Sequence, residues 1–494
     1  MNRALRRISI AILVMFLLLL INVNYLQGFA PASLAGRPGN SRAFYAAQNQ
    51  YERGSIVTSD GVTIALSGLS DGNDVIKYQR RYPQGPEYAP VTGYDTLYSQ
   101  TGIEAAENSL LSGSDSALAV RKFIDLITGK TTKGATVEVT INSKAQAAAY
   151  NALAQLGKPG AVVALNPKTG AILAMASYPS FDPSQLATHA GTLLNKVDKQ
   201  LLADKAQPLL NRALEGAYPP GSTFKIVTSS ALLTNSPSTT INTNVDSPTL
   251  LTLPQTQHVL HNDQGEVCGN GGGQAPLITA FAQSCDTTFA KIGMQLGAGA
   301  LNDMAQKFGM NNANLTIPLT VARSNYVIPP SQALTAFSAI GQYSDTVTPL
   351  QEAMFAAAIA NGGTLMKPYL VQQVTASDLS TVQTTAQSVL SQPVTSSVAG
   401  SVGQMMRAVV QDPNGTAFTF NAQAEGGLVI AGKTGTAETG QFSLNDAAFT
   451  CFAPYGNPDI AVGVIIQGGG YGASAAAPIA VQVIKAYLAT LGNQ

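Results

Sequence analysis

The chain has 494 residues, which is too long for one ordinary domain and long enough for two. Lys and Arg together number 28 and match the 28 Asp and Glu, so no positive charge excess indicates a nucleic-acid partner. Charged residues make up 11% of the chain, against about 25% in typical soluble domains. The composition therefore allows two domains and gives no sign of nucleic-acid binding.

The N-terminus predicts a membrane anchor. Arg3, Arg6 and Arg7 precede an apolar run from Ile8 to Val23, which approaches the roughly 20 residues that cross a bilayer when extended to Phe29. Basic residues stay on the cytoplasmic side, so the remaining chain would face outward. The alternative is a signal peptide cleaved near residues 30–32. We favour an uncleaved single-pass anchor over residues 1–30.

The next segment begins with a strand signal. Arg53-Gly54-Ser55-Ile56, followed by Asp60-Gly61, predicts a strand, a turn and a second strand. Gly102-Ile103-Glu104 follows further along the chain.

Apolar segments separated by turns predict an antiparallel sheet. Gly160 to Leu165 and Ala171 to Met175 flank a turn at residues 166–170, which is typical of a hairpin. Three strand-like segments and a helix follow near the C-terminus: Gly432 to Glu438, Ala447 to Pro454, Asp459 to Gln467 and Ala475 to Leu488. Short connections between neighbouring strands indicate antiparallel pairing.

Ser222-Thr223-Phe224-Lys225 is the strongest candidate for chemistry. Tyr218-Pro219-Pro220-Gly221 cannot continue a helix, whereas the apolar run after Lys225 can. Side chains at i and i+3 share one helix face, so Lys225 can reach the oxygen of Ser222. A partly desolvated lysine can take the proton of a serine and make it a nucleophile. The alternative is a capping serine beside a surface lysine.

Two further motifs follow in order, Ser284-Cys285-Asp286 and Lys433-Thr434-Gly435-Thr436. Ser-x-x-Lys, Ser-Asp-Asn and Lys-Thr-Gly form the joint signature of class A β-lactamases and penicillin-binding proteins. With their context, these motifs resemble class B penicillin-binding proteins, in particular the short penicillin-binding protein A type of actinobacteria. The context is Asn211-Arg212-Ala213, Gly341-Gln342, Thr348-Pro349-Leu350 and Asn361-Gly362-Gly363.

The resemblance implies an α/β (α+β) fold of the serine β-lactamase and transpeptidase type. A five-stranded antiparallel sheet would be flanked by helices, and a helical subdomain would carry the second motif. The implied domains are the anchor at 1–30, a pedestal or dimerisation-like domain at 31–142 and a penicillin-binding transpeptidase domain at 143–494. The pedestal is too short for a glycosyltransferase domain, so another protein would polymerise the glycan.

The resemblance also implies the roles of the site residues. Ser222 would attack the carbonyl between the two terminal D-alanines of a stem peptide, and neutral Lys225 would take its proton. Ser284 would relay the proton to the leaving amine with support from Lys433. Backbone amides of Ser222 and Thr436 would form the oxyanion hole. The Lys-Thr-Gly strand would bind substrate, with the Thr434 and Thr436 hydroxyls on its carboxylate and Gly435 between them.

Asp286 departs from the family pattern, which most often has Asn at this position. A carboxylate close to Lys225 and Lys433 would raise their pKa values and oppose a neutral Lys225. We expect Asp286 to pair mainly with Lys433 and to leave Lys225 neutral. The alternative is that an aspartate is simply tolerated.

The three cysteines and three histidines predict one disulfide bond and no metal site. Cys268 and Cys285 lie close in sequence, and in an exported protein a disulfide bridge is favoured over two buried free thiols. Cys451 lies in an apolar strand-like run and is expected in the core. His258 and His261 near Cys268 match no standard zinc spacing. We expect no metal and no cofactor.

The favoured function is a membrane-anchored D,D-transpeptidase that crosslinks peptidoglycan in division or elongation. β-Lactams should acylate Ser222, and a membrane glycosyltransferase or a divisome or elongasome protein is the expected partner. One alternative is a hydrolase of the same fold, a carboxypeptidase or a β-lactamase. The other is a weakly catalytic scaffold of a cell-wall synthesis complex, for which Asp286 is the only indication.

Overall fold

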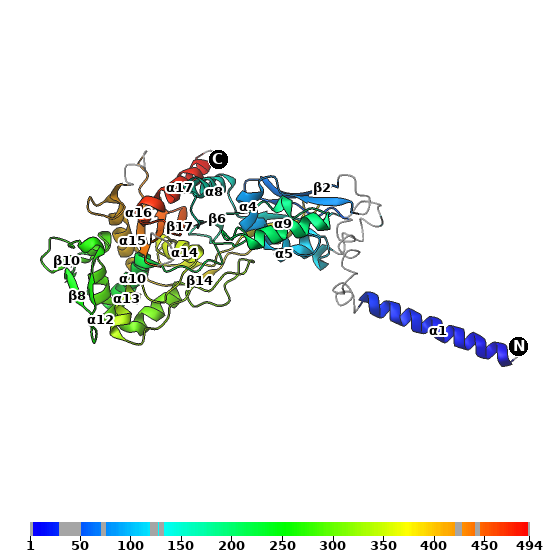
Figure 1. Cartoon of the computed structure of the whole chain (residues 1–494), viewed down its shortest axis with the longest axis horizontal. Coiled ribbons are helices and arrows are strands. Elements are labelled where there is room, and N and C mark those ends of the chain that lie inside the picture. The colour runs from blue at the N-terminus through cyan, green and yellow to red at the C-terminus, as the bar shows by residue number, and fades with distance from the viewer. Residues whose placement is uncertain are drawn as a thin grey trace.

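The computed structural model describes residues 3–28, 51–70, 76–118, 127, 133–419, 427–439 and 445–492. Helix α1 (Arg3–Gly28) lies at one end of the molecule in Figure 1, and the C-terminal domain lies at the other. Within α1, Arg6–Leu26 is long and apolar enough to cross a membrane, and none of it is buried. The predicted N-terminal apolar helix is therefore confirmed. Its orientation in a membrane stays a prediction.

The C-terminal domain contains a five-stranded antiparallel sheet in the order β15-β16-β17-β5-β6. Every predicted segment pairs in it, and all five strands are almost entirely buried. The predicted fold class is confirmed. The strands are β5 (Gly160–Leu165), β6 (Ile172–Tyr178), β15 (Ala431–Ala437), β16 (Asp446–Ala453) and β17 (Ile460–Ile466).

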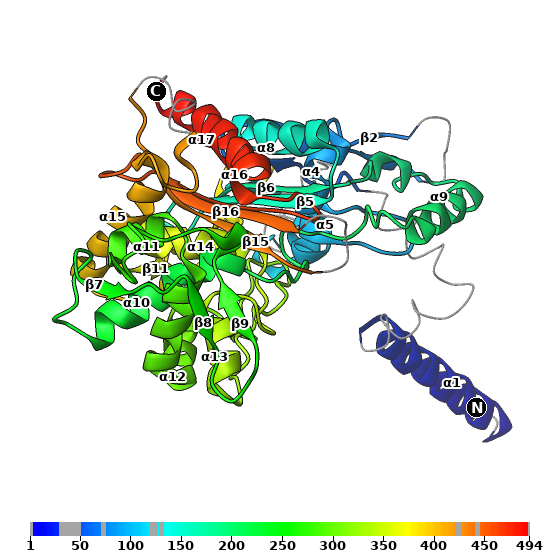
Figure 2. The ribbon, with the colours of Figure 1, turned by 60° about the vertical axis from the view of Figure 1, so that its left-hand side comes forward.

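Helices cover both faces of this sheet, which explains why its strands are buried on both sides. In Figure 2, α8 (Ser143–Leu156) and α17 (Ala477–Leu491) lie on one side and α14 (Pro349–Ala360) lies on the other. Residues 472–491 are also apolar and long enough to span a membrane. Half of that stretch is buried, and α17 packs on α8 and β17, so it is a core helix.

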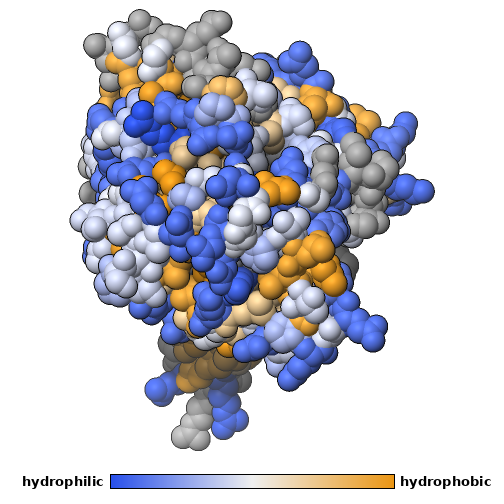
Figure 3. Space-filling model, turned by 90° about the vertical axis from the view of Figure 1, so that its left-hand side faces the viewer, coloured by the Kyte–Doolittle hydropathy of each residue, from blue (hydrophilic) through white to orange (hydrophobic). Residues whose placement is uncertain are grey.

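A helical region beside the sheet carries the second motif, as predicted (Figure 2). Two short antiparallel strand pairs lie on its edge: β7 (Asn244–Asp246) with β10 (Gln274–Pro276), and β8 (Leu250–Thr252) with β9 (Val259–His261). Its helices are α10 (Lys225–Asn235), α11 (Leu277–Ala282), α12 (Asp286–Lys307), α13 (Gln332–Ala339) and α15 (Ser396–Gln411). Figure 3 shows this end of the molecule, whose surface is largely hydrophilic with small apolar patches.

The N-terminal domain is built on a six-stranded sheet in the order β13-β12-β4-β1-β2-β3. The strand, turn and strand predicted after Arg53 are confirmed as antiparallel β1 and β2. Strands β12 and β13 come from within the segment predicted as the transpeptidase domain, so the two parts share one sheet. The strands are β1 (Ile56–Val57), β2 (Thr63–Leu69), β3 (Tyr78–Arg81), β4 (Thr136–Val139), β12 (Val371–Thr375) and β13 (Thr381–Thr384).

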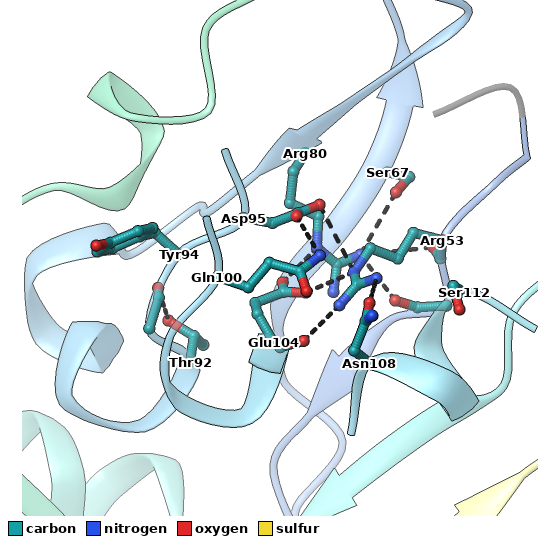
Figure 4. Close-up of polar contacts among 12 residues, drawn as sticks. Arg53, Ser67, Arg80, Thr92, Tyr94, Asp95, Gln100, Glu104, Asn108 and Ser112 are labelled. Carbon is teal, nitrogen blue, oxygen red and sulfur yellow. Dashed lines mark hydrogen bonds and ion pairs between the residues drawn. The ribbon is translucent and has the colours of Figure 1, made fainter. Parts of the chain in front are cut away.

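A buried ionic network holds the N-terminal domain together (Figure 4). Glu104 on α5 (Gly102–Ala106) is fully buried, and its carboxylate accepts from Arg53 Nε at 2.6 Å and Arg80 Nε at 2.5 Å. Arg53 also donates to the Asn108 side chain. Burial by itself raises the pKa of Glu104, but the charges of Arg80 and Arg53 outweigh it and lower that pKa. The carboxylate therefore stays ionised in the core.

The two domains meet at a cavity of about 580 Å³. Helices α4 (Gly85–Thr92) and α5 line one side, and residues 208–215 and 318–320 line the other. Helix α9 (Gly191–Ala203) buries Leu194 in the small apolar cluster beside it. None of the predicted catalytic residues lines this cavity, so it is separate from the predicted active site.

Candidate active site

Ser222 lies on a tight turn that its neighbours fix in place. Residues Gly221–Phe224 form the 3₁₀-helix η3, and α10 follows directly. Gly221 has a φ of +55°, a conformation that favours glycine. A Cβ on Gly221 would also lie 2.6 Å from the Thr436 carbonyl oxygen, so glycine lets the turn approach β15. Ser222 itself is partly exposed.

Lys225 is fully buried, and its amine contacts the second motif. The Nζ atom donates to the Ser284 carbonyl oxygen at 2.7 Å, to Ser284 Oγ at 3.1 Å and to Asp286 Oδ1 at 2.7 Å. These contacts account for all three donors of a lysine ammonium group. Between Ser222 and Lys225 no hydrogen bond occurs within the described part of the chain. The predicted contact of Lys225 with the Ser222 oxygen therefore stays a prediction, whereas the amine contacts oxygens of Ser284 and Asp286 that the motif spacing did not predict.

Ser284 occupies a strained position that brings its hydroxyl into the site. Its φ is +59°, although it is not a glycine. The Ser284 amide donates to Phe281 and the Cys285 amide to Ala280, the paired bonds of a Schellman motif closing α11. Glycine usually fills this position. A serine here accepts local strain and presents an oxygen to both lysines.

Lys433 completes the cluster from β15. Its fully buried amine donates to Ser284 Oγ at 2.8 Å and to the Thr434 carbonyl oxygen at 3.2 Å. The Ser284 hydroxyl therefore lies between two lysine amines that are 208 residues apart in sequence (433 minus 225). The fold brings the first, second and third motifs together.

The predicted pairing of Asp286 with Lys433 is wrong. Asp286 is the first residue of α12 and its carboxylate pairs with Lys225, whereas Lys433 bonds to Ser284 and Thr434. The reason is tertiary. Helix α12 packs against α10, which carries Lys225, while Lys433 approaches Ser284 from the sheet. The carboxylate therefore opposes deprotonation of the lysine that it was expected to leave free.

Burial still favours neutral amines in this cluster. It is the main reason that the pKa of Lys225 is lowered, although the charge of Asp286 and its hydrogen bond act in the opposite direction. The pKa of Lys433 lies well below its usual value, first because of burial and then because of the charge of Lys225. Burial therefore makes loss of a proton from either amine easier than it would be in water.

Strand β15 is the edge strand of its sheet and faces the Ser222 turn. The Gln342 amide donates to the Thr436 carbonyl oxygen at 2.9 Å, so this carbonyl points away from β16. In an antiparallel pair the N–H and C=O of one residue point to the same side. The Thr436 N–H therefore also faces the open edge. A Cβ on Gly435 would lie 2.8 Å from the Pro220 carbonyl oxygen, so only glycine permits this approach.

The two threonines of the third motif differ in exposure. Thr436 is partly exposed, whereas Thr434 is buried and its hydroxyl lies 2.7 Å from that of Thr416. Sequence reasoning did not single out Thr416, and no local signal marks it. Gln342 was named only within the Gly341-Gln342 pair of the family context. That pair was the signal that could have identified its contact with Thr436.

A disulfide bond joins Cys268 and Cys285, whose Cα atoms lie 6.1 Å apart. Cys285 separates Ser284 from Asp286, so the bond fixes the second motif to the loop before α11. Cys451 is a buried free thiol on β16, as predicted. Across the described residues, no group of three or more His, Cys, Asp or Glu could hold a metal ion.

Known proteins share both parts of this architecture. The profile of the penicillin binding protein transpeptidase domain matches residues 160–485, which is more than half of the chain. The chain belongs to the penicillin-binding protein transpeptidase family. The profile of the penicillin binding protein A dimerisation domain matches residues 53–137 of this penicillin-binding protein.

Individual relatives agree with this assignment. The chain is 40% identical to the peptidoglycan D,D-transpeptidase PbpA of Mycolicibacterium smegmatis, with 99% of each chain covered. It is 38% identical to PbpA of Mycobacterium tuberculosis over the same shares. The imipenem acyl-enzyme complex of penicillin-binding protein A from M. tuberculosis superposes with a TM-score of 0.84 at 38% identity, covering 90% of this chain and all of that one.

Proposed function

We propose that this chain is a serine-type peptidoglycan D,D-transpeptidase in which Ser222 forms the acyl-enzyme. The observation that carries the proposal is the Ser284 hydroxyl, which lies between the amines of Lys225 and Lys433 beside the Ser222 turn. A nucleophile, buried amines and a shared hydroxyl supply the parts that acyl transfer requires. Full-length relatives with this activity support the assignment.

In the first step, Ser222 Oγ attacks the carbonyl carbon of the penultimate D-alanine. Its proton passes to neutral Lys225, and the bond to the terminal D-alanine breaks. The departing amine takes a proton through Ser284, which Lys433 supports. An amine of a second stem peptide then attacks the Ser222 ester, which forms the crosslink and returns the proton to Ser222. Each half-reaction thus exchanges one acyl bond for another.

Backbone amides stabilise the oxyanion in both steps. Ser222 is the second residue of η3, where helix N–H groups have no intrahelical partner. The Thr436 N–H faces the same edge, so the two amides converge on one oxygen. Losing one such donor typically slows acyl transfer about 10²–10³-fold. The partly exposed Thr436 hydroxyl binds the substrate carboxylate. The buried Thr434 hydroxyl acts on the same carboxylate through its hydrogen bond with Thr416.

We infer that this chemistry takes place outside the cell membrane, supported by the basic residues that precede the apolar helix. Residues 1–30 form a single-pass anchor, with Arg3, Arg6 and Arg7 on the cytoplasmic side. Residues 31–142 form the pedestal, and residues 143–494 carry the transpeptidase site. A membrane glycosyltransferase, or a division or elongation complex, is the proposed partner that supplies the glycan strands.

The test is intact-mass measurement of the full-length protein in detergent during incubation with penicillin G, beside Ser222→Ala. We expect a stable adduct of one β-lactam per chain that is absent from the variant. Rapid hydrolysis without an adduct would indicate a β-lactamase-type hydrolase instead. With a stem-peptide substrate and an amine acceptor, we expect the crosslinked product, and release of D-alanine alone would indicate a carboxypeptidase.

A further inference from the structure

Glu352 is a buried carboxyl group that the mechanism above does not use. It lies in the first turn of α14 and is fully buried. Its Oε1 lies 2.7 Å from Thr223 Oγ1, and its Oε2 has no hydrogen-bond partner among the described residues. Thr223 directly follows Ser222. The Glu352 carboxyl group therefore contacts the residue next to the candidate nucleophile.

The hydrogen count at Thr223 indicates how this group is protonated. Thr223 Oγ1 also lies 2.8 Å from the Pro220 carbonyl oxygen. A hydroxyl has one hydrogen, and a carbonyl oxygen can only accept. Both contacts are hydrogen bonds at the same time only if Thr223 donates to Pro220 and Glu352 donates to Thr223. The geometry is therefore satisfied by a protonated carboxyl group.

We propose that protonated Glu352 is a positioning residue, which holds the Ser222 turn through a hydrogen-bond chain from its carboxyl group to Thr223 and on to Pro220. The inference rests on the proposed role of Ser222 as the nucleophile. Pro220 and Thr223 lie on either side of Gly221-Ser222 and also contact Gly435 on β15. The chain therefore fixes the turn from α14 at the point where it packs against the substrate-binding strand.

The environment of Glu352 agrees with this protonation. Burial raises the pKa of Glu352 to about 8, and the hydrogen bond to Thr223 opposes the shift. No ion-pair partner for Glu352 occurs within the described residues, although a carboxylate in the first turn of a helix is favoured by the helix dipole. The titratable groups on the surrounding elements are Lys225 on α10, Lys433 on β15, Arg407 on α15, and Asp446 and Cys451 on β16.

Two of those groups, Lys433 and Lys225, carry amines, and both amines have other partners. Lys433 pairs in register with Thr450, whose hydroxyl contacts the Glu352 backbone carbonyl, but the Lys433 amine bonds to Ser284 and Thr434. The Lys225 amine bonds to Ser284 and Asp286. Neither amine is therefore engaged with the Glu352 carboxyl group.

Ionisation of Glu352 would reverse the chain. A carboxylate cannot donate, so the single Thr223 hydrogen would turn towards Glu352 and leave the Pro220 carbonyl oxygen. We therefore expect acylation of Ser222 to slow above about pH 8, the value to which burial raises the pKa of Glu352. The Glu352→Gln variant can still donate from its amide to Thr223 but cannot ionise.

The experiment measures the second-order rate of penicillin G acylation from pH 6 to 10 with full-length protein in detergent. We expect Glu352→Gln to keep the wild-type rate at pH 7 within about threefold and to lose the decline near pH 8. Glu352→Leu should be about tenfold slower at pH 7, because it removes the group that donates to Thr223. A Thr223→Val change should add little to the effect of Glu352→Leu, since both break one chain.

Gln351→Leu is the matched control, because Gln351 is buried on the same helix turn but donates to the Phe308 carbonyl oxygen, away from the site. It should lower stability and leave the pH profile unchanged. The inference is overturned if Glu352→Gln keeps the wild-type decline, or if Glu352→Leu acylates as fast as the wild type. If the wild type forms no adduct, the proposed function itself fails, which is a separate result.

Discussion

The Lys225 amine lies 2.7 Å from the Asp286 carboxylate, and this ion pair sets how easily the candidate base loses its proton. Burial lowers the pKa of Lys225, while Asp286 raises it. The carboxylate therefore favours the protonated form of Lys225, whereas the proposed acylation step needs the neutral form. This competition leads to the first prediction.

Asp286→Asn should move the rising limb of the acylation rate to lower pH. The base acts when neutral, so the rate rises as pH passes the pKa of Lys225. Removing the carboxylate takes away the charge and the hydrogen bond that raise the pKa of Lys225, so this pKa falls and the limb shifts in the same direction. The measurement is the pH dependence of penicillin G acylation. Asp246→Asn, which removes an exposed partner of Lys291, should leave the profile unchanged, and an unshifted Asp286→Asn profile would refute the role of the ion pair.

The effect of the strained Ser284 backbone on stability can be measured separately from the role of its hydroxyl in acylation. Ser284→Gly and Ser284→Ala both remove the oxygen between the two lysines, so each should slow acylation about 100-fold or more. Only glycine also relieves the positive φ. Ser284→Gly should therefore be more stable to chemical denaturation than Ser284→Ala by about 1 kcal/mol. Equal stability of the two variants would show that this position is not strained.

The disulfide bond should stabilise the second motif. Cys268 and Cys285 are 17 residues apart, and closing a loop of this size is worth about 3 kcal/mol in the chain-entropy model. We expect Cys268→Ala with Cys285→Ala to lower the free energy of unfolding by about this amount and to slow acylation. A phosphine reductant should destabilise the wild type but not the double variant. If it affects both alike, the stabilisation does not come from this bond.

The ionic network of the N-terminal domain should govern stability without taking part in catalysis. Glu104→Gln leaves two buried guanidinium groups without their shared carboxylate, which typically costs about 3–5 kcal/mol. Denaturant titration measures the loss. Glu52→Gln, which removes a surface partner of Lys133, should cost at most about 1 kcal/mol. Folded Glu104→Gln protein should still acylate at the wild-type rate, and a slower rate would connect the network to the site.

Much of the fold followed from local patterns in the sequence. The hairpin around residues 166–170 and the three C-terminal strands form where turn residues and apolar runs predicted them, because both signals act over a few neighbouring residues. The contribution of β12 and β13 to the N-terminal sheet was not predictable in this way. Strand β4, the partner of β12, lies more than 200 residues earlier, and a strand carries no local mark of a distant partner.

The sequence by itself determined the three motifs, the turn that exposes Ser222 and the apolar N-terminal helix. Only the tertiary structure decided which oxygen each lysine contacts, because the packing of α12 and β15 sets those distances. It paired Asp286 with Lys225, placed Ser284 between two amines and brought Glu352 to Thr223 across 129 residues. Residue types and their spacing limit the possible chemistry, whereas long-range packing selects the proton path among equally plausible partners.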